Sequence, residues 1–371
     1  MTSIAPMRII FFARLRGRGG IGIRARLRGV SSNGYGFKSR RPHTKNHRKL
    51  RWFFCLFSNI ETYAVPLYNE QVIPIYTHLL EVYNMSRKMG DRKDGTLLRD
   101  LDSMHFIVPL LYPNRCDNEA FISEQINLSA VNAYLEKKNA TNPEYRYNLF
   151  QVIVMVMLKV LTLRPKMNRF IANKNMYQRN EITASFVVKK LFADNGEEAL
   201  AFIHSKPDQC FEDIHQEIYR QVSSCRSEHK DGSTESMDFF NKLPRFISKS
   251  IIAVIRFLDR HGWVPKSLIE TDPYYSSIVL TNLGSIRLHS GYHHLTNWGT
   301  NSFFVAVGEK KLRPFYNEQG QVTMYDSIDI GLTIDERIAD GYYYSKSVRL
   351  MRKLLENPEL LDEPLSKEVE Y

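Results

Sequence analysis

The side chains best suited to chemistry gather between residues 281 and 340. This stretch carries hydroxyl, amide, imidazole and carboxyl groups, at Thr281, Asn282, His289, His293, His294, Asn297, Thr300, Asn301, Asp335, Glu336, Arg337 and Asp340. Their spacing matches neither a zinc-hydrolase helix nor a phosphate-binding loop nor a nucleophile elbow. The residue types alone therefore leave the reaction open.

The histidines and cysteines are not spaced for a metal site. No carboxylate lies at ligand spacing near the three clustered histidines, so we expect them to be loop residues; they are His289, His293 and His294. The cysteines are far apart and form no Cys-x-x-Cys pair; they are Cys55, Cys116, Cys210 and Cys225. This spacing predicts neither zinc nor a disulfide framework, and it favours a cytoplasmic protein. For Cys116, a reactive thiol and a packing residue both remain open.

Two runs of sequence carry a family resemblance. Residues 279–308 include Leu-Thr-Asn-Leu-Gly-Ser and Asn-Trp-Gly-Thr-Asn-Ser-Phe-Phe-Val-Ala-Val-Gly, and residues 331–341 read Gly-Leu-Thr-Ile-Asp-Glu-Arg-Ile-Ala-Asp-Gly. These runs resemble the catalytic domain of 2-oxo acid dehydrogenase acyltransferases, which shares its fold with chloramphenicol acetyltransferase. A looser similarity spans Leu101 to Leu361. The resemblance implies a chloramphenicol acetyltransferase-like α+β fold, a two-layer sandwich with a mixed sheet.

The same resemblance implies acyl transfer between a coenzyme A thioester and a thiol, hydroxyl or amine acceptor. In the family, a histidine in a His-x-x-x-Asp-Gly motif removes the acceptor proton, and a hydroxyl side chain hydrogen-bonds the tetrahedral oxyanion. Carried onto this sequence, Thr281 takes the oxyanion position and Asp340 is the carboxylate that organises the site. Glu336 stands where the family has its histidine. Coenzyme A or acyl-coenzyme A enters as a substrate, and we expect no metal.

Glutamate is a weaker base than histidine for this task. The pKa of a free glutamate carboxyl is about 4.3 and that of a thiol about 8.5, whereas the pKa of imidazole is about 6.5. Proton transfer to an unperturbed carboxylate is therefore about a hundredfold less favourable than transfer to imidazole, unless burial raises the carboxyl pKa. Two interpretations stay open: Glu336 is a poorer base, or it is an ion-pair partner of Arg337 or another arginine in a disused site.

The resemblance also implies a homotrimer whose active sites lie between subunits. The chain has no Asp-Lys-Ala sequence for lipoyl attachment, so we expect a stand-alone catalytic-type domain rather than the core subunit of a dehydrogenase complex. The leading hypothesis is a coenzyme A-dependent acyltransferase with weak or altered activity and small-molecule partners. The alternative is a non-catalytic trimer that binds an acyl thioester or scaffolds other proteins. Neither hypothesis expects a membrane or nucleic-acid partner.

Hydrophobic periodicity predicts the elements that position these residues. Strands are expected at residues 105–112, 119–128, 182–190, 278–280, 302–307 and 328–334. Helices are expected after Ser129, at residues 147–163, 197–203, 211–224 and 239–260, and from Asp340 to near Leu355. Because strands and helices do not alternate regularly, the order favours one large α+β domain at residues 85–371.

The positive charge is confined to the N-terminal sixth of the chain. The 371 residues carry a net charge of +11, yet residues 1–60 hold eleven Arg, three Lys and no acidic residue. We expect residues 1–84 to be a disordered or non-native extension, for which three interpretations remain: a transit peptide, a nucleic-acid-binding arm, and an over-extended reading frame with a later start at Met85. No apolar run reaches the roughly 18 residues of a membrane span.

Overall fold

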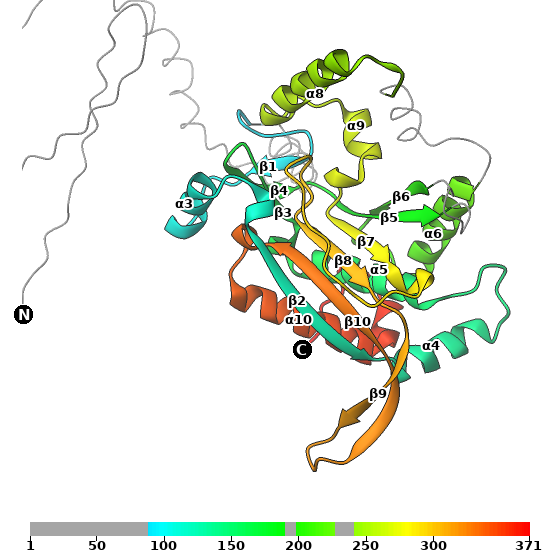
Figure 1. Cartoon of the computed structure of the whole chain (residues 1–371). Helices are drawn as coiled ribbons and strands as arrows, with labels where there is room; N and C mark the ends of the chain where they lie inside the picture. Colours follow the sequence, from blue (N-terminus) through cyan, green and yellow to red (C-terminus); the bar gives the residue numbers. More distant parts are fainter. Residues whose placement is uncertain (1–87, 190–197, 227–240) are drawn as a thin grey trace, which may run out of the picture. The chain divides into compact units, whose positions relative to one another are not determined.

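The computed structural model describes residues 88–189, 198–226 and 241–371 (Figure 1). The extension at residues 1–84 lies outside these ranges. The helices are α3 (Ser103–Leu111), α4 (Ser129–Asn139), α5 (Leu149–Leu163), α6 (Phe211–Arg226), α8 (Arg245–Arg260), α9 (Lys266–Thr271) and α10 (Gly341–Glu356). The strands are β1 (Gly95–Leu97), β2 (Glu119–Asn127), β3 (Arg169–Ala172), β4 (Asn175–Arg179), β5 (Ile182–Lys189), β6 (Glu198–Ser205), β7 (Ile278–Asn282), β8 (Phe303–Val307), β9 (Lys311–Tyr316) and β10 (Val322–Asp335).

One mixed sheet forms the centre of the domain. Its strand order is β2-β10-β8-β7-β5-β6, with β9 paired to β10 outside this path. The β5–β7 and β7–β8 pairs are parallel, and the others are antiparallel. A smaller antiparallel sheet has the order β1-β4-β3. This arrangement confirms the predicted α+β class with a mixed sheet.

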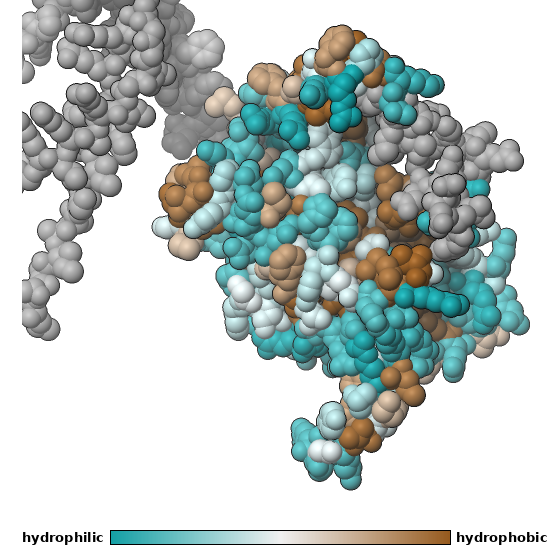
Figure 2. All heavy atoms as spheres, viewed as in Figure 1, coloured by the Kyte–Doolittle hydropathy of each residue, from teal (hydrophilic) through white to brown (hydrophobic). Residues whose placement is uncertain are grey.

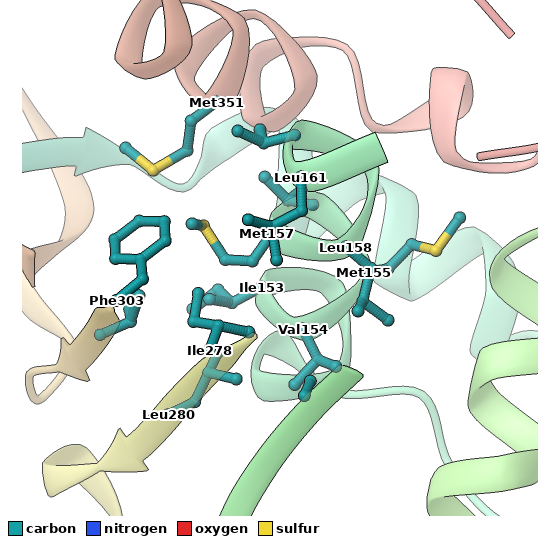
Figure 3. Packing of buried hydrophobic residues seen from close by; sticks show 14 of the residues in the cluster. Ile153, Val154, Met155, Met157, Leu158, Leu161, Ile278, Leu280, Phe303 and Met351 are labelled. Atoms are coloured by element: carbon teal, nitrogen blue, oxygen red, sulfur yellow. The ribbon is translucent and has the colours of Figure 1, made fainter. Parts of the chain in front are cut away.

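Helix α5 fills the middle of the core. Eleven consecutive residues, from Gln151 to Leu161, are buried, so every face of this helix is covered. Figure 3 shows side chains of α5 facing Ile278, Leu280 and Phe303 of the sheet. The capping box between Asn148 and Gln151 starts the helix, which ends just before Pro165, as the apolar run predicted.

A buried lysine ties α5 to the C-terminal tail. Lys159 is fully buried, and its Nζ donates to the backbone carbonyls of Leu360, Glu363 and Pro364 at 2.9, 3.3 and 2.8 Å. Burial lowers the pKa of Lys159 because it disfavours the charged ammonium. The three carbonyl oxygens supply the hydrogen bonds that this buried group requires.

Two predicted elements were wrong in type. The apolar run at residues 105–112 is not a strand but helix α3, because the Asp102 side chain accepts hydrogen bonds from the backbone N–H groups of Met104 and His105 and so starts a helix. The segment at 197–203 is not a helix, since residues 198–205 form strand β6. Ala199, Ala201 and Ile203 alternate into the core there, and the strand pairs with β5.

The remaining predicted elements are present with shifted ends. Strand β10 is much longer than predicted, since its first part pairs with β9 as a hairpin that extends from the body of the domain (Figure 1). Helix α8 begins at Arg245 rather than at residue 239, which lies outside the described ranges. None of the helices in the described part of the chain combines the length and apolar composition needed to cross a bilayer.

Candidate functional site

Thr281 lies near the C-terminal end of β7 and is half-buried. The strand ends there because the Asn282 side chain accepts from the backbone N–H of Ser285 at 3.2 Å and starts a short 3-10 turn. Across the sheet, Thr281 is level with Ala306 of β8, and Ala306 is level with Gly331 of β10.

Glu336 follows the last residue of β10 and is exposed. Its backbone N–H donates to the Asn118 carbonyl at 2.9 Å, which fixes the turn. The neighbouring Arg337 binds Asp335 instead, with Nε and Nη2 at 2.7 and 2.6 Å from the carboxylate oxygens. Within the described residues the Glu336 carboxylate forms no ion pair, either with Arg337 or with another arginine.

A single chain does not bring Thr281 and Glu336 together. Because Thr281 is level with Gly331, Glu336 lies five residue steps further along the chain than that level. At about 3.3 Å per residue this is roughly 16 Å along the strand, more than the two side chains can span. Since β7 and β10 run in opposite directions, the C-terminal end of β7 lies at one end of the strands and that of β10 at the other end (Figure 1).

Asp340 caps helix α10. Its side chain accepts from the backbone N–H of Tyr343 at 2.8 Å, and this hydrogen bond is the main cause of a lowered pKa of Asp340. The residue is exposed and ends the turn that begins at Glu336. Asp340 thereby fixes the path of the chain from the candidate base into α10.

A buried ionic cluster below Glu336 was not foreseen from the sequence. Asp335 and Arg337 are almost fully buried, and Arg115 lies with its Nε 3.7 Å from the Asp335 carboxylate. The Arg115 guanidinium also donates to the carbonyls of Thr296 and Ile171 at 2.6 and 3.0 Å. Burial, the largest cause, lowers the pKa of Arg115 to about 10. The cluster anchors the chain segment that carries Glu336.

Cys116 lies beside this cluster and is exposed. The Asn297 side chain donates to its sulfur at 2.9 Å. Asn118 lies two residues after Cys116, and its carbonyl accepts the hydrogen bond from the Glu336 backbone N–H. The thiol is therefore a surface group near the candidate base rather than a core residue.

The clustered histidines lie on the loop between β7 and β8. His293 stacks on His294 and on Phe304, with ring centroids 4.7 and 4.1 Å apart, whereas His289 lies near Lys311 and Glu309. These contacts confirm that they are loop residues. Across residues 88–189, 198–226 and 241–371, no group of three His, Cys, Asp or Glu side chains is placed to hold a metal ion.

The same loop makes close backbone contact with β10. A Cβ atom on Gly331 would lie 2.0 Å from the carbonyl oxygen of Gly291, so only glycine fits at this point.

We expect Gly331→Ala to lower the free energy of unfolding by about 1–3 kcal/mol, measured by urea titration, because the loop must move away. Gly291→Ala is the matched control, since its Cβ would meet no atom within 4 Å. An equal loss in both variants would contradict this account.

Comparison with known proteins finds a family match for part of the chain. Residues 266–362 match the family model described as 2-oxoacid dehydrogenases acyltransferase (catalytic domain). This segment carries Thr281, Glu336 and Asp340, so the resemblance is confirmed where the candidate site lies. No curated protein matches the chain.

Several solved structures are similar to the chain. A probable dihydrolipoamide acetyltransferase from Listeria monocytogenes is 14% identical with a TM-score of 0.46, over 74% of this chain and 97% of that one. A truncated catalytic core of the 2-oxoacid dehydrogenase multienzyme complex from Thermoplasma acidophilum is 14% identical with a TM-score of 0.44, over 70% and 98%. A chloramphenicol acetyltransferase is 13% identical with a TM-score of 0.45, over 70% and 99%. The family model itself matches residues 266–362, about a quarter of the chain.

Proposed function

We propose that this protein transfers an acyl group from a coenzyme A thioester to a thiol, hydroxyl or amine acceptor, at sites formed between the chains of a homotrimer. The observation that carries the proposal is the exposed carboxylate of Glu336, which is free of ion pairs among the described residues and lies in the segment that matches the acyltransferase family model. A base must reach the acceptor proton and must not be neutralised by a partner.

The proposed reaction uses three groups of the chain. Glu336 takes the proton of the acceptor, whose sulfur, oxygen or nitrogen then attacks the thioester carbonyl. The Thr281 hydroxyl donates a hydrogen bond to the resulting oxyanion. When the tetrahedral intermediate collapses, the carbon–sulfur bond to coenzyme A breaks, and the proton held by Glu336 passes to the leaving thiolate. Asp340 keeps the turn in place through its helix cap.

The separation of Thr281 from Glu336 supports sites shared by two chains. The roughly 16 Å along the strands is closed only if a second copy places its Thr281 near the first copy's Glu336. The β9–β10 hairpin offers a surface for such a copy, because one of its faces is apolar. Leu312, Tyr316, Val322 and Met324 on it are each at least half exposed. Figure 2 shows brown surface on this extended hairpin.

An acyl-transfer assay tests the proposal. The full chain is incubated with acetyl-coenzyme A and a dithiol, alcohol or amine acceptor, and the acylated product is measured by mass spectrometry. We expect Glu336→Gln to lower turnover by about 10²–10⁴-fold, since it removes the base. Glu136→Gln, an exposed glutamate on α4, is the control and should leave turnover unchanged. Binding of coenzyme A without turnover of any acceptor would favour the non-catalytic alternative.

A further inference from the structure

Helix α8 has no buried residue, although its sequence is strongly apolar on one side. Figure 2 shows hydrophobic and hydrophilic surface side by side on this helix, at the top of the molecule. Phe246, Val254 and Phe257 are 71%, 57% and 54% exposed. Their spacing of eight and three residues places them on one outward stripe of the helix. All three side chains therefore stay more than half exposed.

A basic stripe runs beside the apolar one. Arg245, Lys249, Arg256 and Arg260 are exposed and recur at spacings of four, seven and four residues, which keeps them on one face. The only acidic residue of the helix is Asp259, which faces inward and is bound by Arg92 at 2.8 Å. The outward surface of α8 therefore carries positive charge without neutralising acids on the same helix.

Aromatic groups continue this surface past the end of the helix. Trp263 is 60% exposed and forms an edge contact with Phe257, their ring centroids being 6.3 Å apart. Arg92 donates to Asp259, and Lys93 donates to the Val264 carbonyl at 2.9 Å, so this end of α8 is fastened to the domain. Tryptophan and phenylalanine beside a basic stripe are typical of helices that lie in the interface of a membrane.

We propose that α8 binds the surface of an anionic lipid bilayer, with its apolar stripe in the headgroup region and its basic stripe against lipid phosphates and carboxylates. Charge complementarity favours this partner, because four exposed arginine or lysine side chains run beside an apolar stripe on this helix. The sequence led us to expect no membrane partner, whereas this proposal places α8 on a membrane surface. This inference does not depend on the acyl-transfer proposal.

The test must separate α8 from the basic residues 1–60, which can also bind anionic vesicles. Trp263 supplies a local signal. Vesicles of brominated phosphatidylcholine with and without phosphatidylserine are added to the full chain, and the contribution of Trp263 is isolated by subtracting the signal of Trp263→Phe. We expect bromolipid quenching of Trp263 only when phosphatidylserine is present, and weaker quenching at high salt.

Charge reversal on the helix gives the decisive comparison. Lys249→Glu combined with Arg256→Glu should raise the lipid concentration for half-maximal Trp263 quenching by at least about thirtyfold, because two attractive charges are lost. Lys137→Glu with Arg349→Glu reverses two exposed charges on α4 and α10 and should leave quenching unchanged. Unquenched Trp263 on vesicle-bound protein would overturn the proposal. A shift in sedimentation on charge reversal, with quenching unchanged, would assign the face to a second copy instead.

Discussion

Coexpressed Thr281→Val and Glu336→Gln chains are expected to recover about a quarter of wild-type turnover, although each variant is nearly inactive by itself. In the proposed trimer each site would take Thr281 from one chain and Glu336 from its neighbour. With equal amounts and random assembly, each of the two residues is intact at half of the sites, and both are intact at about a quarter. Each single variant should lose at least about 10²-fold, so the recovery is easy to measure.

The recovery is measured by acyl transfer on the unfractionated mixture and on doubly tagged trimers, in which both variants are present and one site of the three is intact, so that recovery there rises to about a third. Trimers made of two differently tagged copies of the same variant are the control and should stay inactive. Mixed trimers without recovery would mean that one chain supplies both residues, in conflict with their separation on the sheet, or that the acyl-transfer mechanism itself is wrong. Turnover of the wild type with the same acceptor distinguishes these two outcomes.

Asp335→Ala is expected to lower the free energy of unfolding by about 3–5 kcal/mol. The Asp335 side chain is 0% exposed, and its removal leaves Arg115 and Arg337 as buried cations without a carboxylate partner. Removing one member of such a pair exposes the full desolvation cost of the other. Urea unfolding followed by circular dichroism measures the loss.

Another aspartate on the same strand provides the matched control. Asp329 also lies on β10 and also binds an arginine, Arg313, through both carboxylate oxygens, but its side chain is 25% exposed. Water can solvate Arg313 once the partner is lost, so Asp329→Ala should cost only about 1 kcal/mol or less. Similar losses in the two variants would show that the buried cluster contributes no more than a surface ion pair.

The sequence predicted best where local signals agree. Helix α5 has an apolar run, a capping pair and a following Pro165, and helix α10 begins at the Asp340 cap, so both were located closely. Helix α3 was misread because an apolar run predicts a buried strand, whereas Phe106 and Leu111 stay exposed on a capped helix. A short apolar segment does not reveal whether anything covers it.

In the candidate site, too, the sequence predicted some features and missed others. Thr281, Glu336 and Asp340 were named from the family resemblance, but their distances depend on strand register, which no local pattern encodes. Arg115 was missed because its partners lie far away in the sequence, the nearest of them more than fifty residues distant. An isolated arginine gives no local signal that it will be buried.

The link between Lys159 and the C-terminal tail bears on the order in which the chain is made. Helix α5 leaves the ribosome about two hundred residues before the carbonyls of Leu360 and Pro364 that accept from its ammonium group. Until those carbonyls arrive, burying Lys159 would leave a charge without hydrogen-bond partners. The core around α5 therefore reaches its final packing only after residues 360–364 have left the ribosome, and until then this helix stays accessible to chaperones and proteases.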